Sequence, residues 1–410
     1  MANQDLETVA NTLRRKPATA AAAAVASAMK FYFANHNVAL STYVQSNCGC
    51  AFSGTGLIGF VSNQSWTSGL TLCGVSSLVG GSAKPYKLEG TPRELRNENG
   101  ALIALTNGNS GSYTGSFVIE DTVLRRGVKR DPSYADTNVT AAYYNGVAFI
   151  ADNYSTFTVD AFELPTPGGA SPVLKWTKQY SGGSSINKIV CTPAGRLYLL
   201  FDSYLLEIDP ANGNILKQIG THRAASSYTT RMFATAEALF ITYMDSATLF
   251  FYVYDLDLTT WWTSNANVSP TSNYSHLCSD GKNAWSFSAY GSSNAPSPGG
   301  GYVYKLTKDG WEQVYSISFS NGGYAYANGI DYDPVTGMIH CMGAYVSFGF
   351  LAADPSAGSK SFGSYGSMSR TGTKGTPAKT ATSIASAVSA STVGQKLSVQ
   401  NLYGGVTVET

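Results

Sequence analysis

The sequence predicts an all-β protein built from repeated units, on three observations. Gly accounts for 42 of the 410 residues and Tyr for 26, a composition typical of strands joined by tight turns. Apolar residues make up 43% of the chain, which is enough to bury a large core. Short runs of β-forming residues alternate with Gly-containing turns along most of the chain, and this pattern excludes a solenoid of helices.

Charged residues are few and nearly balanced. Asp, Glu, Lys and Arg together make up 13% of the chain, and the net charge is +1. An average globular domain has roughly twice that charged fraction. This composition argues against a coiled coil and provides no field that would attract nucleic acid or anionic lipid. We therefore expect no nucleic-acid partner, and no membrane span because no long apolar run occurs.

A hairpin pattern recurs through the middle of the chain: a short strand, a turn with Gly, and a second run of β-formers. Its copies are Leu95–Leu105, Thr140–Ile150, Lys188–Phe201, His276–Phe287, Ile330–Cys341 and, without the glycine, Met232–Tyr243. The turn glycines at 100, 146 and 195 are spaced 46 and 49 residues apart. A period in the forties with four short strands is typical of a β-propeller blade. Residues 46–366 hold about seven such periods, so we expect seven four-stranded blades, with six as the alternative.

The second half of each unit also repeats, as a strand, a tight turn that contains Asp, and another strand. At Asp209–Gly213 and Asp354–Gly358 the turn has the form Asp-x-x-x-Gly. Copies occur at Tyr204–Lys217, Phe250–Trp262, Gly301–Trp311 and Gly349–Gly358. This form resembles the blade repeat of the quinoprotein-like β-propellers, over roughly residues 46–366. The resemblance implies that the Asp caps the turn, that the Gly takes positive φ, and that a large residue packs between blades. The residues in that last position are Trp176, Trp261 and Trp311.

Residues 1–45 are predicted to form an N-terminal helical arm. Asp5–Arg15 has its apolar residues on one helical stripe, and Pro17 breaks or restarts the helix. An Ala-rich helix then continues to about Phe33. The segment imitates a signal peptide, but its apolar part is nearly all Ala and acidic residues precede it.

Residues 367–410 are predicted to form an extended C-terminal tail. Residues 363–396 are mostly Gly, Ser, Thr and Ala, and cannot bury enough apolar surface to fold alone. Because neither end has a core of its own, we expect residues 1–34 and 367–410 to dock onto other proteins of an assembly. The sequence therefore predicts a homo-oligomer or a multi-copy component.

No catalytic, cofactor-binding or metal-binding residue is predicted. The pattern Gly54-x-Gly56-x-x-Gly59 fits a dinucleotide-binding loop, but strand-like residues follow it where that loop needs a helix. The four histidines are scattered and provide no set of three metal ligands, although His276 and His340 could approach a propeller axis. These histidines are His36, His222, His276 and His340. We therefore expect no cofactor.

Three aspartates and one basic cluster have structural interpretations. Asp209, Asp255 and Asp354 hold equivalent places in different blades, so they are predicted to cap turns and not to form a catalytic pair. The basic cluster Arg125–Arg130 is interpreted as a solvated loop, because no aromatic residues are interleaved with it. The six dispersed cysteines are interpreted as small buried residues.

The first functional hypothesis is a structural or interaction protein without enzymatic activity. Low charge, strands rich in Gly, Ser and Tyr, and non-globular ends make the chain similar in general character to virion proteins of tailed bacteriophages, such as tail or head–tail components. That resemblance implies a virion location, with secretion or the cell surface as the alternative. Two alternative functions are a quinoprotein-like dehydrogenase, which needs an axial Ca²⁺ and cofactor site, and a glycan-binding propeller with exposed Tyr and Trp.

Overall fold

The computed structural model describes the strands and many of the turns of the chain. The described residues are 31–35, 50–52, 56–61, 70–77, 81–89, 91–99, 101–107, 117–120, 139–152, 158–164, 172–180, 186–201, 204–220, 230–245, 248–267, 275–290, 299–320, 327–333, 337–343, 346–355, 358–375, 377–381, 390–391 and 407–408. Over these residues the protein is all-β, and its one helical turn is the 3₁₀ segment Gly363–Tyr365. No helix among them is long and apolar enough to cross a membrane.

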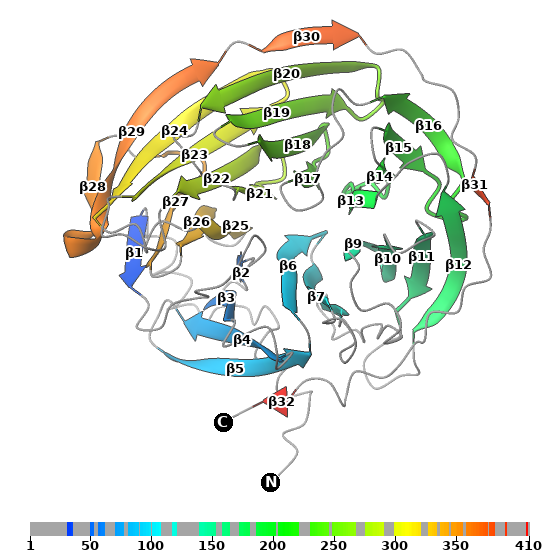
Figure 1. Cartoon of the computed structure of the whole chain (residues 1–410), viewed down its shortest axis with the longest axis horizontal. Helices are drawn as coiled ribbons and strands as arrows, with labels where there is room; N and C mark the ends of the chain where they lie inside the picture. The colour runs from blue at the N-terminus through cyan, green and yellow to red at the C-terminus, as the bar shows by residue number, and fades with distance from the viewer. Residues whose placement is uncertain are drawn as a thin grey trace. The chain divides into compact units, whose positions relative to one another are not determined.

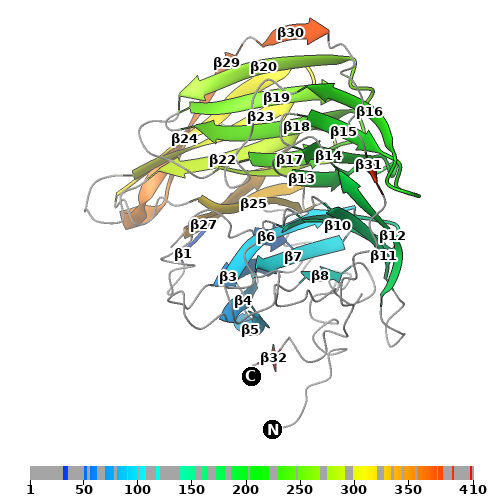
Figure 2. The same ribbon diagram turned by 45° about the vertical axis from the view of Figure 1, so that its right-hand side comes forward.

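The described strands form seven sheets (Figures 1 and 2). The first two contain β2 (Cys50–Phe52), β3 (Gly56–Val61), β4 (Leu70–Ser77) and β5 (Gly81–Glu89), then β6 (Thr91–Glu98), β7 (Ala101–Asn107) and β8 (Phe117–Glu120). The third and fourth contain β9 (Val139–Tyr144), β10 (Val147–Asp152), β11 (Thr158–Glu163) and β12 (Val173–Tyr180), then β13 (Ile186–Cys191), β14 (Leu197–Phe201), β15 (Tyr204–Ile208) and β16 (Ile215–Gly220).

The later sheets continue the same order. The fifth and sixth contain β17 (Thr230–Ala234), β18 (Ala238–Asp245), β19 (Thr248–Asp255) and β20 (Thr260–Asn267), then β21 (Ser275–Ser279), β22 (Ala284–Tyr290), β23 (Gly299–Thr307) and β24 (Gly310–Phe319). The seventh contains β25 (Ala327–Asp333), β26 (Met338–Gly343), β27 (Val346–Leu351) and, as its fourth strand, β1 (Phe31–Asn35). A repeated antiparallel meander of four strands is the architecture of propeller blades, so the predicted fold class is confirmed. The count of seven blades and the helical arm stay predictions, and residues 1–30 of that arm lie outside the described part.

The repeated turns are formed as the sequence pattern predicts. The hairpin glycines that the pattern singled out all have positive φ where they are described: Gly146, Gly195, Gly281 and Gly337. In the second-half turns, Gly213 has φ +74°, and a Cβ there would overlap the side chains of Trp176 and Lys178. Gly213 is therefore required both by the turn and by the close approach of the preceding sheet.

By its internal contacts the chain divides into two compact units. The first contains the third and fourth sheets, whose facing side chains form one apolar core that includes Phe149, Leu199 and Phe201. The second contains the fifth, sixth and seventh sheets. One of its cores lies around Phe251 and Leu306, and another lies between the sixth and seventh sheets and includes Phe287 and Phe348. Inner strands such as β14 and β26 are buried at every residue, so both faces of these strands are covered.

The fourth strand of the seventh sheet corrects two predictions. Phe31–Asn35 is strand β1, paired antiparallel with β27, so the Ala-rich helix does not extend to Phe33. The copy predicted at Gly349–Gly358 also does not continue within its own sheet, because β28 (Ser359–Ser361) pairs with β29 (Gly366–Gly375) in the sixth sheet. The physical reason is burial: Phe31 and Phe33 stack on Phe362, whereas Ser359–Ser361 has no apolar side chain to bury.

The C-terminal segment adds an outer strand to four sheets of its own chain. β29 pairs with β24, and β30 (Ala378–Ala381) pairs with β20. β31 (Ala390–Ser391) pairs with β12, and β32 (Thr407–Val408) pairs with β5. All four pairings are antiparallel, and Figure 1 shows β29 and β30 outside β24 and β20. A segment that cannot fold alone is thus ordered by edges already present. Docking of residues 1–34 and 367–410 onto other proteins stays a prediction.

Candidate functional site

Two of the three predicted aspartate caps are formed. Asp209 Oδ1 accepts the backbone N–H of Ala211 at 2.9 Å. Asp255 accepts the backbone N–H groups of Thr259 at 2.7 Å and Thr260 at 2.9 Å, together with both threonine hydroxyls. Burial raises the pKa of the Asp255 carboxyl, but these hydrogen bonds outweigh burial and lower that pKa below its ordinary value. Both carboxylates therefore act within their own turns.

The third aspartate differs, and a fourth cap was missed. Asp354 lies exposed after β27, in a sheet whose fourth strand comes from the N-terminal side of the chain. Asp280 Oδ1 accepts the backbone N–H groups of Lys282 at 3.0 Å and Asn283 at 2.7 Å, and its Oδ2 accepts the indole N–H of Trp285 at 2.8 Å. The signal for this cap was present in the sequence Ser-Asp-Gly before a strand.

The other residues considered from the sequence form no common site among the described residues. His276 lies on β21 and His340 on β26, and burial lowers the pKa of His340 to about 3, so this imidazole is neutral. His36, His222 and the cluster Arg125–Arg130 lie outside the described residues. No group of three His, Cys, Asp or Glu side chains that could hold a metal ion occurs in the described part of the chain.

The glycine pattern and the described cysteines also have local roles. Gly56–Val61 is strand β3, which follows β2 in one sheet, so the pattern Gly54-x-Gly56-x-x-Gly59 leads into a strand and not into a helix. Cys191, Cys278 and Cys341 are buried thiols outside any disulfide. Burial raises the pKa of the Cys191 and Cys341 thiols, so neither has the character of a reactive thiolate.

Two of the predicted tryptophans pack between neighbouring sheets. The indole N–H of Trp176 donates to the carbonyl of Pro210 at 3.0 Å, in the turn that follows β15. The indole N–H of Trp311 donates to Ser264 Oγ at 2.8 Å, on β20. Both rings close the apolar cores of their units.

In the fifth sheet the residue next to the predicted one makes the corresponding contact. Trp262 donates its indole N–H to the carbonyl of Lys308 at 2.9 Å, in the turn between β23 and β24. Trp261 stacks on Tyr254 within its own sheet, with ring centroids 5.9 Å apart. Successive strand residues point to opposite faces. Composition alone therefore does not show which of two adjacent tryptophans faces the neighbouring sheet.

A buried carboxylate in the first unit connects three of its sheets. Glu98 Oε1 accepts the backbone N–H of Cys191 at 2.8 Å and that of Tyr143 at 3.4 Å. The amide of Asn99 donates to the carbonyls of the same two residues, at 2.8 Å for Tyr143 and 3.1 Å for Cys191. These bonds satisfy backbone groups of β9 and β13, so the role of the pair is structural.

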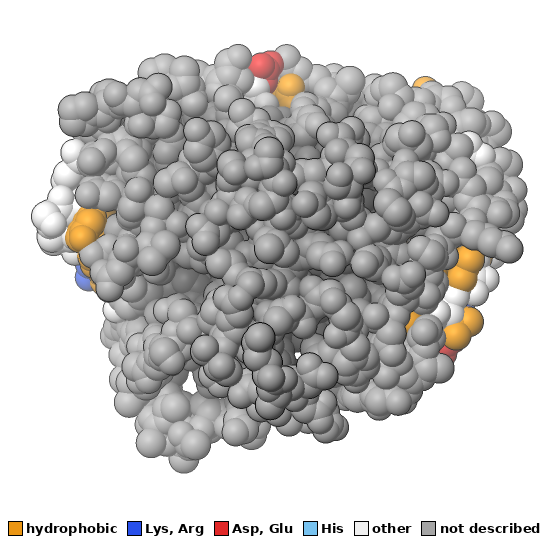
Figure 3. All heavy atoms as spheres, turned by 60° about the horizontal axis from the view of Figure 1, so that its bottom comes forward, with side chains coloured by type: hydrophobic (Ala, Val, Ile, Leu, Met, Phe, Trp, Pro, Cys, Tyr) orange, Lys and Arg blue, Asp and Glu red, His pale blue; other side chains and the backbone are white. Residues whose placement is uncertain are grey.

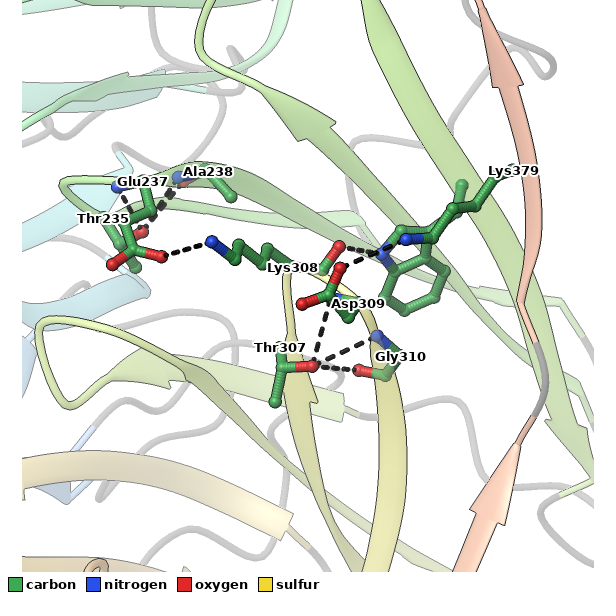
Figure 4. Close-up of polar contacts among 9 residues, drawn as sticks. Thr235, Glu237, Ala238, Thr307, Lys308, Asp309, Gly310 and Lys379 are labelled. Atoms are coloured by element: carbon green, nitrogen blue, oxygen red, sulfur yellow. Dashed lines mark hydrogen bonds and ion pairs between the residues drawn. The ribbon is translucent and has the colours of Figure 1, made fainter.

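The candidate site is a groove of about 520 Å³ in the second unit (Figure 4). It lies where the β17–β18, β19–β20 and β23–β24 turns meet strand β30. Five charged residues line it: Glu237, Asp255, Lys308, Asp309 and Lys379. None of them was singled out for binding by the sequence, because the turns that present them are far apart along the chain.

Two of these turns share one local motif, and the motif positions the charges. Thr235 Oγ1 accepts the backbone N–H groups of Glu237 at 3.2 Å and Ala238 at 3.1 Å. Thr307 Oγ1 accepts those of Asp309 at 3.2 Å and Gly310 at 3.1 Å in the same way. A Thr at the start of a short turn is the one sequence signal that could have marked both places.

Two ion pairs bridge the elements of the groove. Lys308 Nζ lies 3.5 Å from Glu237 Oε2, which connects the sixth sheet to the fifth. Lys379 Nζ lies 3.1 Å from Asp309 Oδ1, which connects β30 to the β23–β24 turn. All four side chains are exposed, so the pairs contribute little to stability and their charges are available to a partner.

The aromatic residues of the groove lie beneath this charged rim. Tyr254, Trp261 and Trp262 line the groove but are almost fully buried. Their ring faces are therefore not offered for stacking on a sugar. The Thr260 hydroxyl in the groove donates to Asp255 Oδ2 at 2.7 Å, as part of the turn that this carboxylate caps. The arrangement is suited to binding a polar, charged surface.

One segment, the C-terminal strap (residues 359–375 and 377–381), borders the groove and is held by its own contacts. Met368 is buried, and Arg370 forms an ion pair with Glu312 and donates to the carbonyl of Val314 at 3.0 Å. Gly375 lies under Trp311, where a Cβ would overlap the indole ring. The strap therefore places Lys379 at the groove.

Apolar surface is scarce among the described residues. The large hydrophobic side chains exposed there are Val173, Leu174 and Leu216, on the outer strands β12 and β16. On the face shown in Figure 3, described hydrophobic side chains form small separate groups at the rim. Among the described residues, the charged groove is therefore a better candidate for binding a partner than these small apolar groups.

The known proteins that the chain resembles share little sequence identity with it. No protein-family model matches the chain, and no curated protein matches it. Among solved structures it is similar to the WD40 domain of Toxoplasma gondii coronin, with 11% identity, a TM-score of 0.47, and coverage of 78% of this chain and 86% of that one. It is also similar to BamB from Moraxella catarrhalis, with 11% identity, a TM-score of 0.42, and coverage of 79% of this chain and 99% of that one. These similarities are too low to support an argument about function, and the fold assignment rests on the sheets themselves.

Proposed function

We propose that this chain is a non-catalytic interaction scaffold and, more specifically, a multi-copy component of a tailed-bacteriophage virion. The general character of the sequence supports the virion assignment: low charge, strands rich in Gly and Tyr, and ends of different composition. The contacts of the candidate residues support the absence of catalysis. The carboxylates of Asp209, Asp255 and Asp280 are used in turns, and His340 is neutral and buried.

The observation that carries the scaffold proposal is the pairing of the C-terminal segment with four outer strands. An unpaired outer strand is a template for uncontrolled association. The chain covers part of these edges itself, through β29, β30, β31 and β32. A partner would then be recognised by the turns between strands, which is where scaffolds of this architecture carry their variable residues.

The groove supplies such turns, and its charges define the partner. Its rim presents Glu237 and Asp309 as acceptors, and Lys308 and Lys379 as donors. A protein surface or extended segment with both basic and acidic side chains would exchange these intramolecular pairs for intermolecular ones. The cost is small because the existing pairs are exposed.

We expect the double substitution Lys308→Gln with Lys379→Gln to reduce incorporation into the native complex about tenfold while changing thermal stability little. The reason is that two recognition charges are lost, whereas exposed pairs contribute only about 0–1 kcal/mol each to folding. The measurement is native mass of the complex purified from the natural background. Lys175→Gln is the matched control, because Lys175 also forms an exposed ion pair, with Glu163, but lies on β12 outside the groove. Equal incorporation of both variants would argue against recognition by the groove.

The virion assignment has a separate test. An antibody raised against the folded chain should label tailed particles in immunoelectron microscopy, and the chain should co-sediment with them in a gradient. If the chain is found in particle-free fractions and not with the particles, the proposed virion location is wrong.

A further inference from the structure

Among the described residues of the second unit, four buried hydroxyl groups have no hydrogen-bond partner in the protein. They are Thr242 Oγ1, Ser275 Oγ, Ser286 Oγ and the Tyr304 hydroxyl. Each of these residues is at most 1% exposed. We call them the hydroxyl cluster. They account for most of the unpartnered buried side-chain atoms among the described residues. Buried polar groups are normally hydrogen-bonded, so the concentration of these hydroxyls in one unit needs a physical explanation.

The strand register brings three of the four onto one face of the sixth sheet. Ser286 on β22 lies directly opposite Tyr304 on β23. Leu277 on β21 lies opposite Ser286 from the other side, and Ser275 is two residues before Leu277. Directly opposite residues, and residues two apart on one strand, share a face of the sheet. Ser275, Ser286 and Tyr304 therefore point in the same direction.

The fourth hydroxyl lies on the sheet that packs against this face. Thr242 on β18 is directly opposite Phe251 on β19. The ring of Phe251 contacts the ring of Tyr304, with centroids 5.3 Å apart, and β18 also contacts β21. Phe251, Leu277 and Tyr304 belong to one buried core between the fifth and sixth sheets. The hydroxyl cluster thus lies within a single interface between two sheets, surrounded by apolar side chains.

Four hydroxyls without partners would weaken such an interface considerably. A hydroxyl transferred from water into an apolar core loses its hydrogen bonds, and only a new partner compensates for that loss. Each hydroxyl can donate one hydrogen bond and accept two. Burial also raises the pKa of Tyr304, so its hydroxyl stays protonated and available as a donor.

We propose that the hydroxyl cluster is a binding site for ordered water between the fifth and sixth sheets. Buried water typically makes about three hydrogen bonds to polar groups that lack protein partners, and the cluster supplies such groups on both sides of one interface. Water bound there would link β18 to β22 and β23 by hydrogen bonds. This inference is independent of the proposed scaffold function, because it concerns how two sheets of one unit are joined.

Removing one hydroxyl of the cluster tests the proposal. Tyr304→Phe deletes only the hydroxyl, and we expect it to raise the unfolding equilibrium constant about fivefold in urea titrations, because a bound water loses a partner. Ser286→Ala should have an effect in the same direction. The matched control is Tyr180→Phe, since the Tyr180 hydroxyl is equally buried but donates directly to the Gly213 carbonyl at 2.8 Å. That control should also be destabilised. If Tyr304→Phe and Ser286→Ala are as stable as the parent or more stable, the hydroxyls hold no water and the proposal is wrong.

A crystal structure that resolves ordered solvent provides the second test. The parent protein should show water within hydrogen-bond distance of Ser286 Oγ and the Tyr304 hydroxyl, and this density should weaken in Tyr304→Phe. A dry interface, with the hydroxyls bonded to one another or to backbone carbonyls, would overturn the proposal. Density for an ion in place of water would overturn it equally.

Discussion

We expect truncation of the chain after Tyr365 to lower the free energy of unfolding by at least about 3 kcal/mol relative to the full chain. Such a truncation removes β29 and β30, and with them the antiparallel partners of β24 and β20. It also removes Met368, whose burial is of the kind that costs about 2–5 kcal/mol when truncated to Ala. Chemical denaturation followed by circular dichroism measures the difference.

The control for this truncation is a chain that ends after Ala381. It retains the strap, and of the described strands it loses the short β31 and β32. We expect the second unit of this longer chain to keep the stability that it has in the full protein. The shorter chain should also associate at high concentration, because the edges of β24 and β20 become available. Equal stability of the two truncated chains would show that the strap does not stabilise the sheets.

Phe362→Ala is expected to destabilise the second unit by about 3–5 kcal/mol, the range for a fully buried aromatic residue. Phe362 is completely buried at the point where the strap meets β1 and β27. Its ring stacks on Phe33 at 4.9 Å and on Phe348 at 5.5 Å between centroids. The substitution removes the stacking of this ring on Phe33, which is one of the contacts between β1 and the strap, and thermal unfolding measures the loss.

Phe362→Leu is the graded comparison for this substitution. Leucine retains apolar volume but not the stacked geometry, so the loss should be smaller than with alanine. A second control is Val173→Ala, because Val173 is 60% exposed and its truncation should change stability by less than about 0.5 kcal/mol. If Phe362→Ala resembles Val173→Ala, the aromatic contacts do not contribute as described.

The repeat pattern could be predicted from sequence because its signals are local. A glycine that must take positive φ, such as Gly195 or Gly337, marks its turn whatever surrounds it. Asp209 and Asp255 bond to N–H groups within five residues of themselves, so their role as caps also follows from nearby sequence. The all-β class and the course of the strands follow from many such signals repeated with one period.

The pairing of distant segments could not be predicted in the same way. Phe31 and Phe33 alternate as a strand requires, but they follow a run of Ala that favours a helix, and their partner β27 is more than 300 residues away in sequence. The strap has little apolar content, and its strands are stable only because β24 and β20 present unpaired edges to them. Neither the pairing of β1 with β27 nor that of the strap with β24 and β20 produces a pattern in the nearby sequence that would predict it.

The candidate groove shows the same limit. Lys308 and Glu237 are ordinary turn residues until the fifth and sixth sheets bring them to 3.5 Å. Lys379 reaches Asp309 only because β30 pairs with β20. The choice between Trp261 and Trp262 depends on which strand face meets the next sheet, and composition does not specify it. Sites assembled from several turns require the tertiary structure before they can be recognised.

Hydrogen–deuterium exchange of β24 in the full chain tests most directly whether the strap is an integral part of the propeller sheets. In the structure Tyr315 is paired with Arg370 and Phe319 with Gly366, so β24 has a partner on both sides. We predict that amides from Tyr315 to Phe319 exchange as slowly as those of the central strand β23, opening only with the unfolding of the unit. Exchange at the rapid rate of an unpaired outer strand would contradict the account, because it would mean that the C-terminal segment is a free arm.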